Sequence, residues 1–352
     1  MFDLLSITVY IAVPIFCFWI AKFSERFNKK QGVWWIVILL SLVAGLRAVS
    51  VGIDTKTYEM AFELVGSGVM QGVYGMEKSF LYICKFLLCI WNHPNFLYTV
   101  FAFISHGLVL FRIWKDREYI SFHWSVFAYY ILFFAFSLNG MRQFVAVAIV
   151  FYATDFIKEG KYVRFIAAVF VAAMFHSSAM VGIAYLFFEI IFIRFFNQKR
   201  KLIVFLLLVV GGVLGFSIVS GLLNIYSKYF EHQAASVGLM MVVKLVLLIF
   251  SVVVIERPTD KNEYYYLSHR LNYFVGLLLN SLNYIFLYMG RIGLYFYLFE
   301  AVYIGYLFQS KNRKKWMIWF KFIYVVLLLY YLCDNVSRGS QGEMPYRFFW
   351  QS

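Results

Sequence analysis

Long apolar stretches recur along the whole chain and are separated by short polar segments. A helix needs about 20 apolar residues to cross the hydrocarbon core of a bilayer, where its backbone must satisfy its own hydrogen bonds. About a dozen stretches qualify: 4–22, 32–50, 95–113, 122–138, 139–157, 162–175, 178–194, 201–222, 237–255, 270–289, 292–309 and 316–333. This pattern predicts an all-α polytopic membrane protein, with residues 1–352 forming a single membrane domain.

One further apolar segment, 79–91, is too short to cross a bilayer and contains Lys85. Segments of this length are more often re-entrant or interfacial helices. We therefore expect residues 51–94 to form an extracytoplasmic loop that carries this short helix. Residues 334–352 should form an extracytoplasmic tail.

The distribution of charge indicates an orientation. The chain is 63% hydrophobic and only 14% charged, far from a soluble composition, and its 32 Lys and Arg outnumber 18 Asp and Glu to give a net charge of +14. If segment 79–91 does not cross, most of these cations fall in loops on one side, and basic loops are retained in the cytoplasm. The charge excess therefore indicates an outward N-terminus and membrane topology, and we expect no nucleic-acid partner.

Several common motifs are missing from the sequence. The first apolar stretch has no basic n-region and no small-residue cleavage site, so we expect a span and not a cleavable signal peptide. The four cysteines lack metal-type spacing and are predicted to be buried small residues: Cys17, Cys84, Cys89 and Cys333. Because there is no P-loop, glycine-rich nucleotide fingerprint or His-x-x-x-His pair, we expect no cofactor and no nucleotide hydrolysis.

Polar side chains from five distant stretches are predicted at the outer membrane–water boundary. They are Arg47 with the loop that carries Asp54 and Tyr58; Asn139, Arg142 and Gln143; His176; Arg291; and Arg338 and Arg347 of the tail. A guanidinium near hydrocarbon is costly, and its planar donors suit bidentate phosphate binding. The pattern predicts a site for an anionic headgroup, above all a diphosphate.

Structural interpretations compete with this hypothesis. An arginine at the end of a span often snorkels to lipid phosphate, which would explain Arg47 or Arg338 taken alone. Asp54 follows Gly52 and could simply close an Asx-type turn. A lone histidine such as His176 is more often a satisfied interfacial residue. Residues 139, 142 and 143 are spaced to share one helical face, which favours a common site over a purely local turn.

The order of these residues resembles a known family. Arg47, Gly52-x-Asp54-Thr55-x-x-Tyr58, Asn139-x-x-Arg142-Gln143 and Phe175-His176-Ser177 resemble the EpsG-type bacterial polysaccharide polymerases, which are related in role to Wzy-like O-antigen and capsule polymerases. The motifs fall within residues 45–180. Arg291 and Arg347 fit the family's habit of late outward-facing arginines without a firm motif.

The resemblance implies a GT-C-like glycosyltransferase that crosses the bacterial plasma membrane many times, with its active site facing outside. Its substrates would be oligosaccharide repeat units linked through diphosphate to undecaprenol, surrounded by membrane lipids. The growing chain would pass to a sugar hydroxyl of an incoming unit, and undecaprenyl diphosphate would leave. No nucleotide sugar or metal would be needed. The repeat unit, the linkage, the anomeric outcome, the polymer made, the oligomeric state and any flippase or chain-length regulator partner stay open.

The reaction that the resemblance implies suggests a catalytic or binding role for each motif residue. Arg142 and Arg291 are predicted to contact the diphosphate, with Arg47 and Arg347 as second choices, since arginines can stabilise the charge of the leaving group in place of a metal. His176 and Asp54 are the two possible general bases. His176 is favoured because an unperturbed histidine pKa of about 6.5 lies nearer neutrality. The side chains expected to orient sugar or phosphate oxygens are Asn139, Gln143 and Tyr58.

Two other functions compete. A flippase or small-solute carrier would suit twelve spans, and charges within or near spans favour it: Glu189, Lys244, Glu300 and Lys321. Transporters, however, place their charges near the midplane and often contain repeats, whereas here the polar residues gather on one side and no repeat is evident. A sugar acyltransferase would need an acidic partner at a fixed spacing, and none follows His176.

Overall fold

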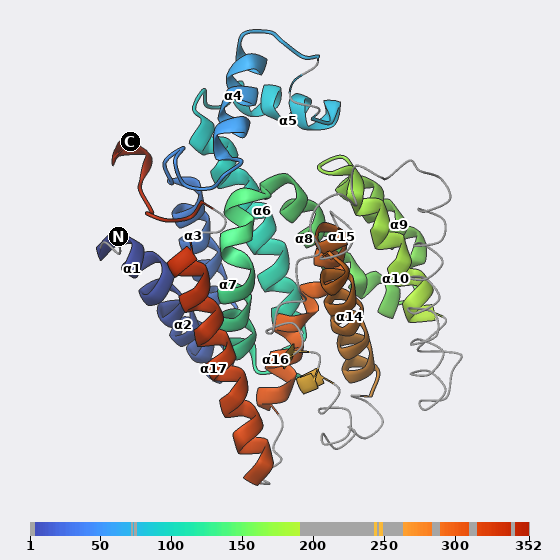
Figure 1. Cartoon of the computed structure of the whole chain (residues 1–352). Coiled ribbons are helices and arrows are strands. Elements are labelled where there is room, and N and C mark those ends of the chain that lie inside the picture. Colours follow the sequence, from blue (N-terminus) through green and yellow to red (C-terminus); the bar gives the residue numbers. More distant parts are fainter. Residues whose placement is uncertain are drawn as a thin grey trace. The chain divides into compact units, whose positions relative to one another are not determined.

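The structure is a computed structural model that describes residues 4–71, 73, 76–190, 243–244, 246–248, 263–283, 289–309, 315–338 and 342–351 (Figure 1). Within these ranges every regular element is a helix, apart from one isolated antiparallel bridge between Arg47 and Phe348. The predicted span 201–222 and most of 237–255 lie outside the described residues.

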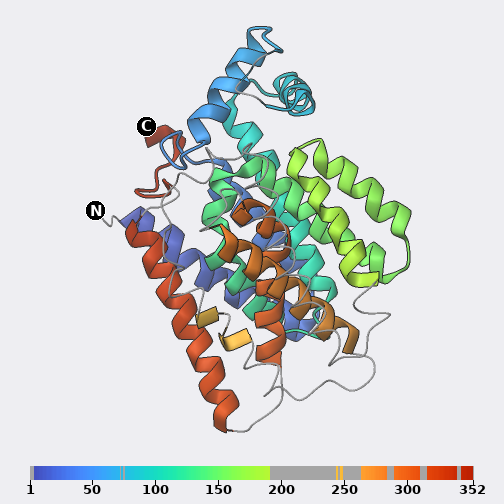
Figure 2. The same cartoon turned by 45° about the vertical axis from the view of Figure 1, so that its right-hand side comes forward.

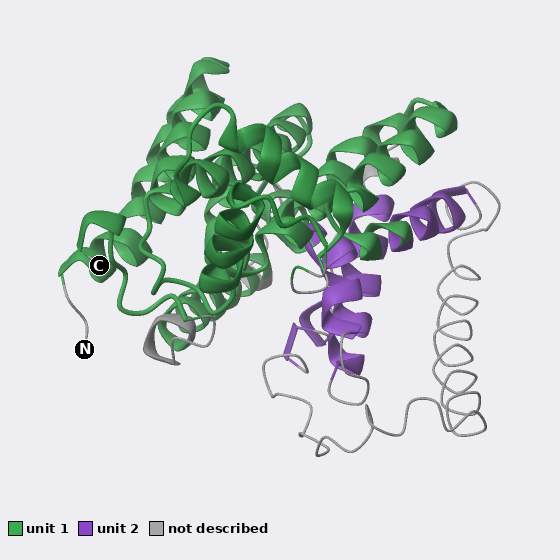
Figure 3. Ribbon diagram, turned by 90° about the horizontal axis from the view of Figure 1, so that it is seen from above, with its two compact units in different colours: residues 1–180, 300–352 green, residues 181–299 purple. Residues whose placement is uncertain are grey.

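The chain divides into two compact units, coloured separately in Figure 3. Unit 1 contains Met1–Met180 and Glu300–Ser352, and unit 2 contains Val181–Phe299. Most described helices belong to unit 1: α1 (Leu4–Ile7), η1 (Thr8–Ala12), α2 (Val13–Phe27), α3 (Gln31–Gly45), α4 (Thr55–Gly66), α5 (Lys78–Leu88), α6 (Pro94–Lys115), α7 (Phe122–Asn139), α8 (Met141–Lys158), α9 (Tyr162–Ala173), nearly all of α16 (Phe299–Gln309), α17 (Lys315–Arg338) and η4 (Phe349–Gln351). The helix η2 (Ser177–Ile183) crosses the boundary, and α10 (Ala184–Phe187), α14 (Glu263–Leu282) and α15 (Met289–Tyr297) follow in unit 2.

Within the residues that the structure describes, five helical segments are long and apolar enough to cross a membrane: Leu4–Phe27, Pro94–Lys115, Phe122–Asn139, Met289–Gln309 and Met317–Asp334. Three shorter apolar helices in the same part of the chain cover Gln31–Gly45, Tyr162–Ala173 and Ser177–Ile190. These segments support a polytopic all-helical membrane protein. The figure of twelve spans stays a prediction, as does the re-entrant or interfacial position of α5, which has 11 residues.

Local sequence explains several helix ends. Asn28 adopts the left-handed conformation after α2 at φ 50°, which ends that helix, and Pro94 begins α6 where its missing N–H costs nothing. Gly140 separates α7 from α8, close to where the predicted spans 122–138 and 139–157 adjoin. Of the four cysteines, Cys17 and Cys84 are buried as predicted. The prediction is wrong for Cys89, which is exposed in the turn after α5, and for Cys333, which is exposed on α17.

Helix α6 lies in the middle of unit 1, in contact with α3, α7 and α8 (Figures 1 and 2). At its first residues, the Asn95 side-chain amide donates to the carbonyls of Gly45 (2.6 Å) and Arg47 (2.8 Å). Just beyond its last residues, Arg117 Nε donates to Asn28 Oδ1 at 3.0 Å. Arg47, which is predicted at the outer boundary, therefore lies near the first residues of α6, and the basic residue Arg117 lies at the other end. The helix between them is about 33 Å long.

A buried charge network lies at the Lys115 end of α6. The Arg112 side chain is 1% exposed, and its nitrogens contact Asp116 Oδ2 at 2.5 Å and Asp155 Oδ1 at 3.0 Å. Lys115 Nζ lies 2.9 Å from Asp155 Oδ2, and Lys158 Nζ lies 3.4 Å from Asp116 Oδ1. The network joins α6 to α8, so these basic residues do more than determine orientation.

Replacing Asp155 with Asn should destabilise the protein by about 3–5 kcal/mol, because it leaves the buried Arg112 guanidinium without half of its compensating charge. Thermal unfolding of the detergent-solubilised protein, followed by the monodisperse fraction, measures the change. Glu159→Gln is the matched control. It breaks a 2.5 Å pair with Lys161 whose side chains are nearly half exposed, which should contribute less than about 1 kcal/mol. Equal effects of the two variants would contradict a stabilising role for the buried network.

Candidate functional site

Arg47 fixes the loop of residues 46–54 that follows α3. Its side chain is 2% exposed, and its guanidinium donates to the carbonyls of Ala44, Val51 (3.3 Å) and Leu138 (2.8 Å). The same group lies 4.5 Å from the centre of the Tyr98 ring. All three guanidinium nitrogens therefore bind backbone, which joins the end of α3 to the end of α7.

The loop is held from a second side by Asn139. The Asn139 side-chain oxygen accepts a hydrogen bond from the Asp54 backbone N–H at 2.8 Å, directly before α4 begins. Gly52 adopts a φ of 97°, which favours glycine, and its N–H donates to the carbonyl of Gly342 at 2.8 Å. The Asp54 side chain is half-buried and makes no cap hydrogen bond to α4. The Gly-x-Asp motif is therefore positioned by a residue of the Asn-x-x-Arg-Gln motif.

The tail lies along the same loop. The Ala48 N–H donates to the Arg347 carbonyl at 2.8 Å, and the Phe349 N–H donates to the Leu46 carbonyl at 2.9 Å. The Tyr10 hydroxyl donates to the Glu343 carbonyl at 2.8 Å, which adds the first span to this end of unit 1. The side chain of Arg347 is half-buried and donates to the Tyr346 carbonyl at 2.9 Å.

Arg142 belongs to an ion pair that the sequence analysis did not foresee. It lies in the first turn of α8, and its Nη1 is 2.5 Å from Glu77 Oε2, while its guanidinium carbon lies 4.9 Å from the centre of the Phe80 ring. The other Glu77 oxygen, Oε1, accepts the Ser177 backbone N–H at 3.0 Å. One carboxylate thus connects Arg142 with the neighbour of His176. In the sequence, Glu77 is distinguished only by its position as an acidic residue directly before the short apolar helix.

Glu77 has the ionisation expected of a paired carboxylate. Partial burial acts to raise its pKa, but the hydrogen bond from the Ser177 amide and the charges of Arg142 and His176 outweigh burial and lower the pKa below the ordinary value of a glutamate. The Glu77 carboxylate is therefore ionised at neutral pH.

The His176 ring is oriented by its own turn. Its Nδ1 accepts the Ser178 backbone N–H at 3.3 Å and lies 2.7 Å from Ser178 Oγ. With Nδ1 accepting, the neutral ring carries its proton on Nε2. The hydroxyl of Ser79 in α5 donates to the Met174 carbonyl, so the turn of His176 is attached to α5 as well as to Glu77.

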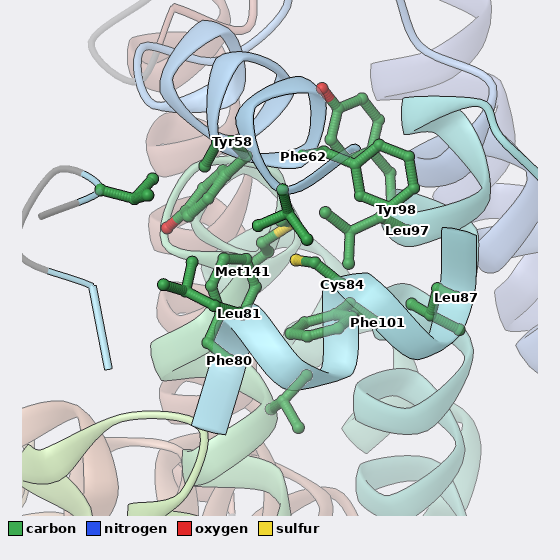
Figure 4. Packing of buried hydrophobic residues seen from close by; sticks show 14 residues of the cluster. Tyr58, Phe62, Phe80, Leu81, Cys84, Leu87, Leu97, Tyr98, Phe101 and Met141 are labelled. Carbon is green, nitrogen blue, oxygen red and sulfur yellow. The ribbon is translucent and has the colours of Figure 1, made fainter. Parts of the chain in front are cut away.

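An apolar core supports this end of unit 1 (Figure 4). It joins α4, α5, α6 and the first turn of α8, with Tyr58, Phe80, Phe101 and Met141 among its members and Phe175 packed against it. The Tyr58 ring lies edge-on to Phe80 at 6.2 Å between centroids. The backbone that carries Glu77 and Arg142 is thus held by packing. Tyr58 and Gln143 are both buried, 6% and 3% exposed.

The structure brings most of the predicted site residues to one end of unit 1. Hydrogen bonds attach Arg47, Asn139 and Arg347 to the 46–54 loop, which also contains Asp54. Glu77 connects Arg142 to the turn of His176. Arg291 lies on α15 in unit 2 with an exposed side chain, and Arg338 lies in the last turn of α17. Among the described residues, no group of three or more His, Cys, Asp and Glu could hold a metal ion.

The apolar helices define a multi-pass membrane protein. The predicted site residues gather at one end of these helices and form a polar site beside the spans. A family model described as the EpsG family matches residues 32–348. The chain belongs to this family, a Wzy-like polysaccharide polymerase family, which confirms the resemblance. Membership implies polysaccharide polymerase-type function by a glycosyltransferase-like enzyme. Comparison with curated proteins and with solved structures gives no match.

Proposed function

We propose that this protein joins oligosaccharide repeat units carried on undecaprenyl diphosphate at the outer face of a bacterial plasma membrane, with undecaprenyl diphosphate as the leaving group. The family match across residues 32–348 is the observation that carries the proposal. The reaction needs no nucleotide sugar, because the energy resides in the glycosyl–diphosphate bond of the donor. In this proposal arginines take the electrostatic role that a metal ion would otherwise have at the leaving diphosphate.

In this reaction a sugar hydroxyl of the incoming unit attacks the anomeric carbon of the growing chain. The new C–O bond forms as the bond from that carbon to the diphosphate oxygen breaks, and the bonding electron pair leaves with the diphosphate. The hydroxyl proton passes to a base on the protein. Catalysis therefore requires cations at the leaving oxygen and a base at the acceptor.

Arg142 is the first choice for the diphosphate contact. Its guanidinium is 12% exposed, already pairs with a carboxylate, and lies at the end of unit 1 where the motif residues meet. Arg291 is the second contact in the proposal, and Arg347 a further one. The three backbone carbonyls around Arg47 favour a different role for that residue, which is to hold the 46–54 loop in place.

His176 is the proposed base, with Asp54 as the alternative. A base must be unprotonated at the nitrogen that takes the proton. Nε2 is unprotonated in the tautomer in which Nδ1–H donates to Ser178 Oγ, 2.7 Å away, and this is the tautomer that the proposed reaction requires. Asn139 supports this assembly indirectly, because it fixes the backbone of Asp54. Gln143 and Tyr58 stay as proposed orienting side chains.

A transporter of lipid-linked oligosaccharide is the second candidate, and buried charges in unit 2 favour it. Lys244 donates to the Tyr297 hydroxyl at 2.5 Å, and the Asn272 amide donates to Glu189 at 3.1 Å, with Lys244 and Glu189 both buried. Buried ionisable groups of this kind are common in substrate and proton pathways.

A reconstitution experiment separates these functions. Purified protein in lipid nanodiscs is mixed with synthetic undecaprenyl-diphosphate repeat units and a chelator, without ATP or nucleotide sugar, and the products are separated by gel electrophoresis. The proposal expects a polymer ladder. A transporter would give no ladder, and an acyltransferase would modify the sugars only when an acyl donor is supplied.

A further inference from the structure

Glu77 occupies the position at Arg142 that an anionic ligand would take. The Glu77 carboxylate lies 2.5 Å from Arg142 Nη1 and is itself about one quarter exposed. The Nε atom of Arg142 is buried and makes no hydrogen bond to any residue that the structure describes. A guanidinium has five N–H donors, so this one has donors to spare for a ligand larger than one carboxylate.

Glu77 also contacts the turn that carries His176. Its second oxygen holds the Ser177 amide at 3.0 Å, next to His176, and its own residue lies directly before α5. Its side chain does not cap α5, since both carboxylate oxygens are engaged elsewhere. Removing the carboxylate from Arg142 would therefore alter the turn of His176 at the same time.

We propose that Glu77 is a resident counter-ion that holds Arg142 before the substrate binds, is displaced by the diphosphate of the lipid substrate, and returns to Arg142 to expel the diphosphate that leaves. This inference rests on the proposed function, because that function supplies the diphosphate. Glu77 acts through Arg142 and is a positioning residue.

Competition between two anions for one cation explains why the exchange is useful. An unpaired guanidinium near hydrocarbon would be costly, and the carboxylate keeps it paired, oriented and partly desolvated before substrate arrives. A diphosphate carries more charge and more acceptor oxygens than one carboxylate, so it can displace Glu77. The carboxylate in turn lowers the affinity for the product, which would otherwise bind tightly and leave slowly.

The exchange predicts an unusual kinetic result for Glu77→Gln, which keeps the shape and an acceptor for the Ser177 amide but removes the negative charge. If the ion pair blocks Arg142 about nine-tenths of the time, the variant should bind diphosphate about tenfold more tightly. In polymerisation its KM should fall, and its kcat should fall too because product leaves more slowly. A purely structural role for Glu77 would raise KM instead.

Binding of inorganic diphosphate to the purified full-length protein, measured by isothermal titration calorimetry without magnesium, tests the inference. Glu77→Asp serves as a second variant. It keeps the charge but is one methylene shorter, so it cannot hold Arg142 and the Ser177 amide together, and it should bind with an affinity between those of the wild type and Glu77→Gln. Glu159→Gln, which opens an exposed 2.5 Å ion pair with Lys161 just beyond the last residue of α8, should bind like the wild type.

The two proposals fail separately. Tighter binding by Glu77→Gln, lost again in Glu77→Gln/Arg142→Ala, supports the counter-ion role. If the Gln variant does not fold, an affinity of Glu77→Asp above that of the wild type supports the role. Unchanged or weaker binding by the folded Glu77 variants overturns it, whatever the wild type polymerises. Absence of a ladder from the wild type overturns the proposed function, whatever the binding comparison shows.

Discussion

Replacing Arg142 with alanine should abolish polymer formation while the protein stays inserted and folded. In the proposed reaction the Arg142 guanidinium meets the charge that grows on the leaving diphosphate, and removal of one such preorganised donor typically lowers the rate by about 100- to 1000-fold. The Glu77 carboxylate left behind is 24% exposed, so water can solvate it and the fold should survive. The length distribution of the reconstituted polymer is the measurement.

Two further variants serve as comparisons for Arg142→Ala. Arg117→Ala removes another half-buried arginine, one that donates to Asn28 at the opposite end of α6, and it should leave the ladder unchanged. Arg142→Lys retains the charge but loses the bidentate fork, so it should recover only part of the activity. A normal ladder from Arg142→Ala in correctly folded protein would exclude Arg142 from the diphosphate site.

Replacing His176 with alanine should lower the polymerisation rate by about 100- to 10,000-fold and leave the binding of the lipid substrate nearly unchanged. A general base contributes to the transition state and little to ground-state binding, which explains the expected split. Initial rates of ladder formation, set beside binding of a non-reactive lipid-linked analogue, measure both quantities on the same preparation.

His123 provides the matched control for His176. Its Nδ1 lies 2.6 Å from Glu25 Oε2, in the part of unit 1 that joins the start of α7 to the end of α2, so His123→Ala should affect stability and not rate. If His176→Ala loses rate and binding in equal proportion, the histidine acts in binding or structure, and Asp54 becomes the base to test next.

Much of the helical arrangement could be predicted because its signals are local. Apolar stretches of the right length and the residues at which they begin or end, such as Pro94, Asn28 and Gly140, are local features of the sequence. The gathering of Arg47, Asn139 and Arg142 at one end could also be predicted, because topology assigns the two ends of every span.

The partners of these residues could not be predicted, because they depend on contacts between distant segments. Nothing local distinguishes Glu77 from another loop acid, although it pairs with a residue 65 positions away. Arg112 has the pattern of a loop cation that determines orientation, yet it is buried between two aspartates. Arg47 could equally have faced a phosphate, and only the structure places three backbone carbonyls around it.

The pairing of the tail with the 46–54 loop has a consequence for biosynthesis. The hydrogen-bond partners of residues 46–48, which lie at Arg347 and Phe349, are synthesised about three hundred residues after the loop itself. Throughout that interval the loop must satisfy its polar backbone with water or lipid headgroups, since contacts so distant along the chain form late. The site end of unit 1 is thus completed only after residues 342–349 have been made, so a shorter nascent chain would lack an assembled site.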